Sequence, residues 1–155
     1  MNRKIIAILA LLVVAIGMGA VSAFSLSDLT GSSSDAEIVT IDGIDFNIPA
    51  GFVEEEDLSL DGVVNETQGI KYTTWGKTYV NDENKVISIG VATYDGVEVD
   101  DEIAKYIGGD RLSINGVDGY EYNVGQFEGF AYAKDGKLVI ISTNDGSVLD
   151  ELIVK

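Results

Sequence analysis

Cysteine and histidine are both absent from this chain of 155 residues, and it has one proline and one tryptophan. Without cysteine there is no disulfide framework and no thiol nucleophile. Without histidine the commonest general base and metal ligand is missing as well. No Gly-rich phosphate-binding motif replaces them. The composition therefore favours a non-enzymatic protein, with no catalytic residue, no metal site and no cofactor to assign.

Basic residues are also few, with ten Lys and Arg against 26 Asp and Glu. When Arg3 and Lys4 of the N-terminal segment are set aside, eight basic residues remain and the net charge is −18. Such a chain repels phosphate backbones and anionic lipid surfaces, so nucleic acid is not expected as a partner. The apolar content of 46% is too high for intrinsic disorder.

The first residues have the layout of a secretory signal peptide, which we assign to residues 1–23. A short basic start, Asn2-Arg3-Lys4, precedes an unbroken apolar run from Ile5 to Ile16, and Val21-Ser22-Ala23 ends in the small residues of a cleavage site. The alternative is an uncleaved anchor, since residues 5–21 are just long enough to span a bilayer. In either case the rest of the chain is expected to be extracytoplasmic, as a secreted or membrane-anchored protein.

The remainder divides into a linker and one domain. Residues 24–36 are small and polar, which is typical of a flexible tether. Residues 37–155 are enough for a single extracytoplasmic domain with its own core. An Asn-Glu-Thr sequon makes Asn65, on an expected loop, a candidate N-glycosylation site.

Short β-type runs separated by turn residues dominate the domain. Asp42-Gly43 between two alternating runs predicts a first hairpin, because Asp and Gly tolerate the positive φ of a type I′ turn. Gly69–Val80 and Lys85–Tyr94 predict two long paired strands. Arg111 to Thr143 predicts a meander of about four antiparallel strands. Asp-Gly occurs six times without a fixed period, which indicates turns rather than a repeat array.

Two short helices complete the prediction. Asp100 is a good N-cap for a helix that buries Val99, Ile103, Tyr106 and Ile107 on one side. Ser147 to Asp150 forms a weaker capping box before a terminal helix. The expected fold class is α+β, an antiparallel sheet of meander hairpins with two short helices packed on one face, after the N-terminal signal or anchor helix.

Three segments together resemble small secreted domains of the PsbP/Mog1-like kind. They are IDFNIPAGF near the start of the domain, INGVDGYEY in its middle, and FAYAKDGKLVIIS before the terminal helix. The chain looks most similar to uncharacterised DUF4367-like domains and to acidic secreted proteins of methanogenic archaea. The resemblance covers about Ile38 to Ile153 and implies a curved antiparallel sheet flanked by helices. It implies no catalytic residue.

The candidate ligand-binding residues lie on one strand. Lys71, Trp75, Lys77 and Tyr79 fall on the same face if the strand is unbulged. A tryptophan and a tyrosine flanked by amines could stack on a sugar ring or seat a peptide. The alternative is ordinary cross-strand packing with lysine stems over the rings, the commoner fate of aromatic strand residues.

Acidic runs at residues 54–57, 82–83 and 100–102 raise two further possibilities. Ca²⁺ needs about six to eight oxygen ligands, and no run has the EF-hand spacing, so a solvated face is the favoured interpretation. The leading hypothesis is a secreted or membrane-tethered non-enzymatic domain that binds a protein or cell-envelope polymer, touching the membrane only through residues 5–21 if these stay uncleaved. The alternatives are a carboxylate-dependent envelope glycan hydrolase and a Ca²⁺-stabilised surface module.

Overall fold

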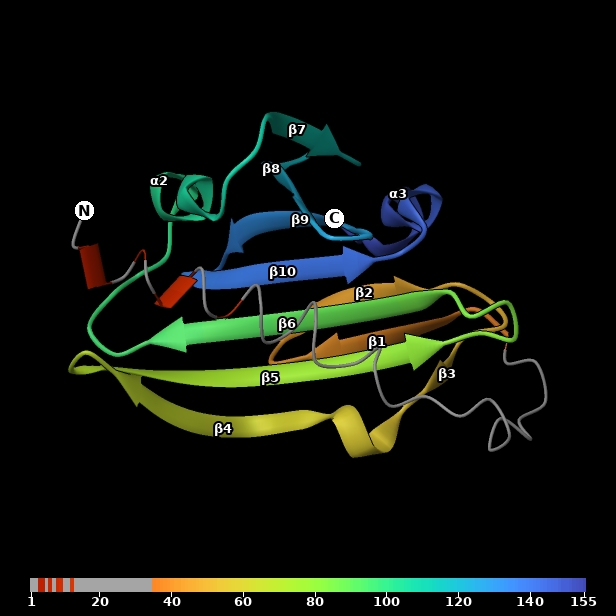
Figure 1. Cartoon of the computed structure of the whole chain (residues 1–155), viewed down its shortest axis with the longest axis horizontal. Coiled ribbons are helices and arrows are strands. Elements are labelled where there is room, and N and C mark those ends of the chain that lie inside the picture. The colour runs from red at the N-terminus through yellow and green to blue at the C-terminus, as the bar shows by residue number, and fades with distance from the viewer. Residues whose placement is uncertain (1–2, 5, 7, 10–11, 13–34) are drawn as a thin grey trace.

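The computed structural model describes residues 3–4, 6, 8–9, 12 and 35–155. Within this part, eight strands form one antiparallel sheet: β3 (Val53–Glu54), β4 (Leu60–Thr67), β5 (Ile70–Val80), β6 (Val86–Tyr94), β7 (Arg111–Ile114), β8 (Val117–Val124), β9 (Phe127–Lys134) and β10 (Lys137–Thr143). The order across the sheet is β3-β5-β6-β10-β9-β8-β7, and β4 pairs with β5 as well. A separate hairpin of β1 (Glu37–Ile41) and β2 (Ile44–Ile48) lies against one face (Figure 1).

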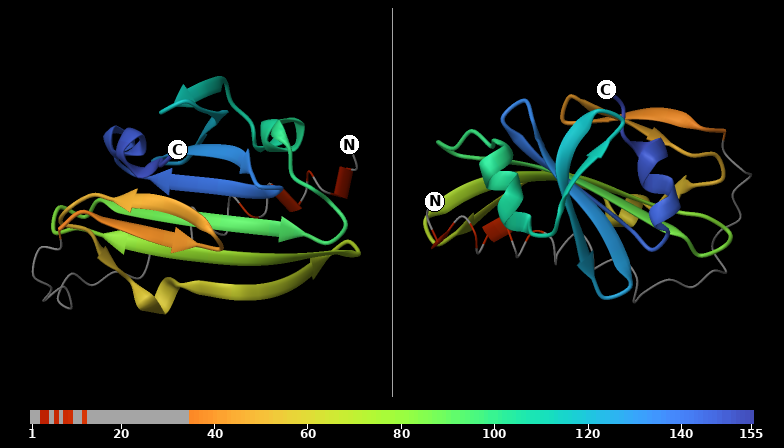
Figure 2. Two further views of the ribbon diagram at one scale, coloured as in Figure 1. Left: turned by 180° about the vertical axis from the view of Figure 1, so that it is seen from behind. Right: turned by 90° about the horizontal axis from the view of Figure 1, so that it is seen from above.

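The helical elements of residues 35–155 are all short. They are α2 (Asp101–Ala104), α3 (Leu149–Leu152) and the 3₁₀ turns η2 (Glu56–Leu58), η3 (Lys105–Ile107) and η4 (Gly146–Val148). A mostly antiparallel sheet with two short α-helices confirms the expected α+β class. The sheet is strongly twisted, so that β9 and β10 cross the direction of β4 and β5 when seen from above (Figure 2).

The predicted hairpin turns are confirmed by their backbone angles. Asp42, Asn115 and Asp135 have φ of 44°, 52° and 53°, and each is followed by a glycine with positive φ. These pairs connect β1 to β2, β7 to β8 and β9 to β10. Asp118-Gly119 is different, because it lies inside β8 and makes no turn. Asp-Gly therefore marks a turn between β1 and β2 and between β9 and β10, but it does not mark one inside β4 or β8.

The sheet buries both of its faces, as β10 shows. Leu138 and Ile140 point to one face and Val139 and Ile141 to the other, and all four are fully buried. We call the side that packs on β1, β2 and α3 the hairpin face, and the side that packs on α2 the α2 face. The hairpin-face core contains Phe46, Tyr79, Ile87, Ile89, Val91, Phe130, Tyr132 and Leu152, among others.

The prediction that both helices pack on one face is wrong. Ile103 and Ala104 of α2 join the core of the α2 face, whereas Leu149 and Leu152 of α3 join the core of the hairpin face. Consecutive residues of a strand point to opposite faces of the sheet, so the face on which a following helix docks depends on the residue at which the chain leaves the strand. The apolar side of the helix itself does not determine which face of the sheet it packs on.

Three smaller expectations also need correction. Tyr106 is 47% exposed rather than buried with Ile103. The terminal helical segment begins with Asp145, whose carboxylate accepts from the Ser147 backbone N–H, and not with a capping box at Ser147. Residues 60–67 form the edge strand β4, so Asn65 lies exposed on a strand and not on a loop.

The N-terminal segments are described in part. Arg3, Lys4, Ile6, Ile8, Leu9 and Leu12 are helical. The other residues of the expected signal or anchor segment, and the expected linker before Asp35, lie outside the described residues. Within the described part of the chain, no helix has the length and apolar character needed to cross a bilayer.

Candidate functional site

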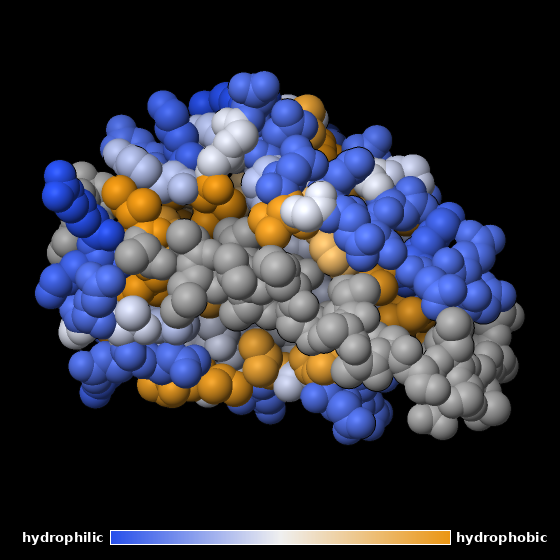
Figure 3. Space-filling view, in the orientation of Figure 1, coloured by the Kyte–Doolittle hydropathy of each residue, from blue (hydrophilic) through white to orange (hydrophobic). Residues whose placement is uncertain are grey.

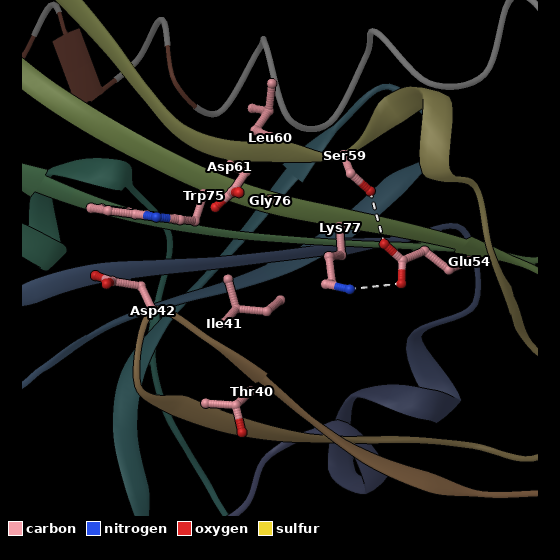
Figure 4. Close-up of a pocket in the computed structure, with 10 residues that line it drawn as sticks. All are labelled: Thr40, Ile41, Asp42, Glu54, Ser59, Leu60, Asp61, Trp75, Gly76 and Lys77. Atoms are coloured by element: carbon pink, nitrogen blue, oxygen red, sulfur yellow. Dashed lines mark hydrogen bonds and ion pairs between the residues drawn. The ribbon is translucent and has the colours of Figure 1, made fainter.

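A cleft of about 320 Å³ lies between the β1–β2 hairpin and the β4–β5 edge of the sheet (Figure 4). Its walls come from four strands and the segment between β3 and β4. The lining residues are Thr40, Ile41, Asp42, Glu54, Ser59, Leu60, Asp61, Trp75, Gly76 and Lys77.

A β-bulge in β4 shapes the wall beside Trp75. Leu60 pairs with Gly76 and Val63 pairs with Thr74, so β4 carries one more residue than β5 at this point. The extra length is at Asp61 and Gly62, where Gly62 has φ of 64°. A Cβ on Gly62 would lie 3.5 Å from the indole Nε1 of Trp75, which places the bulge backbone against the ring. Bulges commonly re-aim side chains next to binding sites, and here Asp61 lines the cleft with Trp75.

A polar network forms the opposite end of the cleft. The ammonium of Lys77 donates to Glu54 Oε2 at 2.7 Å, and the hydroxyl of Ser59 donates to Glu54 Oε1 at 2.8 Å. The side chains of Lys77 and Glu54 are 33% and 28% exposed. Both carboxylate oxygens are thereby fixed, so a ligand that enters the cleft meets a preformed charged pair.

The hairpin turn and the bulge each supply one more carboxylate. Asp42 pairs with Lys137 at 2.8 Å, with its side chain 24% exposed. The exposed carboxylate of Asp61 makes no hydrogen bond or ion pair with any residue that the structure describes. The cleft therefore combines an aromatic ring, one ion pair and an acceptor without a protein donor. This arrangement suits a ligand that has an apolar face and several hydroxyl or cationic groups.

The structure separates the four residues that the strand pattern grouped. Trp75 and Lys77 both line the cleft. Tyr79 is fully buried in the core of the hairpin face, where burial and the nearby charges of Glu54 and Glu37 raise the pKa of its phenol. A ligand has no access to Tyr79 in this arrangement. Lys71 is exposed near the far end of β5, opposite Glu66, and does not line the cleft.

Five polar lining residues were not among the predicted ligand-binding residues: Thr40, Asp42, Glu54, Ser59 and Asp61. Asp42 and Asp61 both belong to Asp-Gly pairs, Glu54 begins the acidic run 54–57, whose favoured interpretation is a solvated face, and Ser59 lies two residues after that run. The signal that could have indicated them is the unusual Asp61-Gly62 pair shortly before a long β-type run, since glycine inside a strand often marks a bulge.

The acidic runs do not gather into a cation site. Among the described residues, no group of three or more of His, Cys, Asp and Glu is placed to hold a metal ion. In the first run, Glu54 turns to Lys77 while Glu56 and Asp57 are exposed on η2.

The fold and the cleft define an α+β domain with a small acidic cleft built around a single tryptophan. Comparisons of the chain with protein-family models, with curated proteins and with solved structures find no match. The resemblance to PsbP/Mog1-like domains therefore stays a prediction.

Proposed function

We propose that this chain is a secreted or membrane-tethered, non-enzymatic binding domain, and that it holds a sugar unit of a cell-envelope polymer in the Trp75 cleft. The observation that carries the proposal is the partly exposed indole of Trp75 beside Asp61, a carboxylate without a protein donor among the described residues. Nucleic acid is not proposed, because the net charge of the chain is −16.

The chemistry of the cleft matches the two sides of a sugar ring. The flat C–H face of a pyranose can stack on the indole, which offers a large apolar surface at low conformational cost. The hydroxyl groups at the ring edge can donate to Asp61 and exchange hydrogen bonds with Lys77 and Glu54. A volume of about 320 Å³ is at the small end for ligand sites and fits about one or two rings of a longer chain.

The test compares the wild-type chain with Trp75→Ala on a glycan array and against purified cell-envelope polysaccharide. Trp75 is the single tryptophan, so its fluorescence also reports occupancy of the cleft in the wild type. We expect about a tenfold or greater loss of affinity in the variant, because the indole supplies a large apolar contact area and a loss of about 1.4 kcal/mol is tenfold in affinity.

The matched control is Tyr106→Ala, which removes another exposed aromatic ring outside the cleft. It should bind as the wild type does. Equal binding of every polysaccharide ligand by wild type and Trp75→Ala would contradict the proposal.

A second candidate is an envelope glycan hydrolase, because Asp42, Glu54 and Asp61 line the same cleft. Hydrolysis needs two carboxylates on either side of the scissile bond, one of them able to give a proton. Asp42 and Glu54 are already held by lysines, which makes binding the better supported function. Release of reducing ends from envelope polysaccharide by the wild type, lost in Asp61→Asn, would favour the hydrolase instead.

A further inference from the structure

The α2 face of the sheet has an apolar centre that the domain itself covers only at one end. In Figure 3, in which this face is turned to the viewer, apolar residues appear as separate patches between polar residues above and below. The element that covers one end is α2, through Ile103 and Ala104. The other buried residues of the cluster in the domain are Tyr72, Ala92, Tyr94, Val99, Tyr120, Tyr122, Ala131, Leu138 and Ile140.

Residues of the N-terminal segment belong to the same cluster. Ile8, Leu9 and Leu12 are helical and are 0%, 0% and 5% exposed. They pack with the residues of the α2 face, and Figures 1 and 2 place the described part of this segment beside α2. Ile8 and Leu12 are four residues apart and therefore share one side of a helix with Leu9 next to them. The α2 face of the sheet thus packs against one apolar side of the helical segment.

Because of this packing, the α2 face is a second apolar environment, besides a bilayer, in which the segment can be buried. Residues 5–21 are predicted to enter or cross a membrane, and the α2 face offers Ile8, Leu9 and Leu12 of this segment an apolar surface on the domain. We propose that the α2 face is a docking surface for an apolar helix, and that its occupant in the folded 155-residue chain is the N-terminal segment of the same molecule. The intact chain then covers its own export or anchor segment in water.

Two physical arguments favour this occupant. Soluble monomers rarely expose contiguous apolar patches of more than a few hundred Å². The apolar face that contains Leu138, Ile140 and Ala92 is therefore expected to be buried by another segment. The segment also starts with the exposed cations Arg3 and Lys4, while the rest of the chain carries −18. That charge attracts the start of the segment to the domain and weakens attraction of the whole chain to anionic lipid.

The test is site-specific photocrosslinking in the intact 155-residue chain, confirmed by mass and without lipid or detergent. Benzoylphenylalanine replaces Leu9 in one sample and Leu12 in a second, so that one failed preparation does not decide the result. We expect crosslinks at the mass of the monomer, mapped to β6 and β10 peptides. The same probe at Ile38, which is 59% exposed at the start of the domain, should give none to those peptides.

A variant with a filled groove supplies the second measurement. Ala92→Phe adds a ring at the centre of the α2 face, where Ala92 is fully buried. With folding checked by circular dichroism, we expect the crosslink yield to fall at least fivefold and flotation with neutral phosphatidylcholine vesicles to rise. Crosslinks at dimer mass would assign the face to a second copy. That result, or monomers without any crosslink to the sheet from either position, would overturn the proposal.

Discussion

Tyr122 and Tyr94 both bury a phenol ring on the α2 face, but their hydroxyl groups differ. The Tyr122 hydroxyl donates to the Ile141 carbonyl at 2.8 Å and shares a 2.5 Å hydrogen bond with Ser142 Oγ. The Tyr94 hydroxyl has no hydrogen-bond partner among the described residues. Burial raises the pKa of both phenols, so each stays protonated at neutral pH. The two residues form a natural pair for measuring what a satisfied buried hydroxyl contributes.

Tyr122→Phe is expected to lower the free energy of unfolding by about 1–2 kcal/mol, because it removes a buried hydrogen bond and leaves Ser142 with one partner fewer. Tyr94→Phe should be neutral or stabilise by up to about 1 kcal/mol, since it removes a buried polar atom that gains nothing in return. Urea denaturation followed by Trp75 fluorescence measures both. Equal losses in the two variants would mean that Tyr94 has a partner in solution.

Gly129 lies directly under the ring of Tyr122, its partner across β8 and β9. A Cβ at Gly129 would come within 2.1 Å of the Tyr122 ring carbon Cζ. The ring has no easy way to move aside, because its hydroxyl is tied to β10. Gly129→Ala is therefore expected to cost about 2 kcal/mol or more through overpacking.

The matched control is Gly76→Ala in β5, where the nearest atom to the new Cβ is the Ile89 carbonyl oxygen at 3.4 Å. This change should be neutral or stabilise slightly, by about 0.5 kcal/mol, because alanine restricts the unfolded chain. Thermal denaturation of the two variants gives the comparison. Similar melting temperatures for Gly129→Ala and the wild type would contradict the close ring packing.

At the scale of elements, the carboxylate of Asp145 holds the start of the terminal helical segment. It accepts from the backbone N–H of Ser147 at 3.2 Å and from its hydroxyl at 2.6 Å, and pairs with Lys85 at 2.9 Å. These donors lower the pKa of Asp145 from 3.8 to about 2. A lowered pKa means that the folded state binds the proton less well than the unfolded state. The stabilisation is thus fully present above about pH 4 and is lost as pH falls towards 2.

Asp145→Asn should therefore be less stable than the wild type at pH 6, and the difference should shrink between pH 4 and pH 2. Urea midpoints measured at several pH values test this. Asp82→Asn, at an exposed loop position, should show no such convergence. A difference that stays constant down to pH 2 would show that the Asp145 charge is not what stabilises the segment.

Elements with a local cause could be predicted from sequence, and β4 shows why others could not. The hairpins follow from Asp-Gly and Asn-Gly turns whose backbone angles depend on two residues alone. Strand β4 lacks an alternating pattern because it lies at the sheet edge, with Val63 and Val64 both exposed. In the part of the chain that the structure describes, β4 pairs with β5 alone, so its formation depends on that pairing and not on its own apolar face.

At the scale of the whole molecule, the candidate site depends on contacts that a strand pattern does not contain. Trp75 and Tyr79 have the same parity on β5, and the pattern treats them alike. The core of the hairpin face closes over Tyr79, whereas Trp75 lies at the edge, where the bulge of β4 leaves the cleft. The face of the sheet to which each ring points was predictable from the sequence. How deeply each ring is buried depends on segments more than ten residues away in sequence.

The charge of the whole chain leads to the last prediction. Residues 35–155 form six ion pairs among themselves, all partly exposed, and exposed pairs contribute little to stability because solvent and salt screen them. Most of the acidic residues between residues 35 and 155 make no ion pair within this range and therefore repel one another. Raising NaCl from 0.01 to 0.1 M shortens the Debye length from about 30 to about 10 Å, which weakens long-range repulsion more than close pairs.

We therefore expect added salt to stabilise the fold, with the free energy of unfolding rising on the order of 1 kcal/mol over this range. Glu55→Gln/Glu56→Gln removes two charges that make no described ion pair, so it should raise stability at 0.01 M NaCl and show a smaller gain from salt. Urea denaturation at both salt concentrations measures each effect. If salt instead lowered the stability of the wild type, the attraction within the ion pairs would outweigh the repulsion among the acidic residues. The charged surface would then stabilise the fold and not destabilise it.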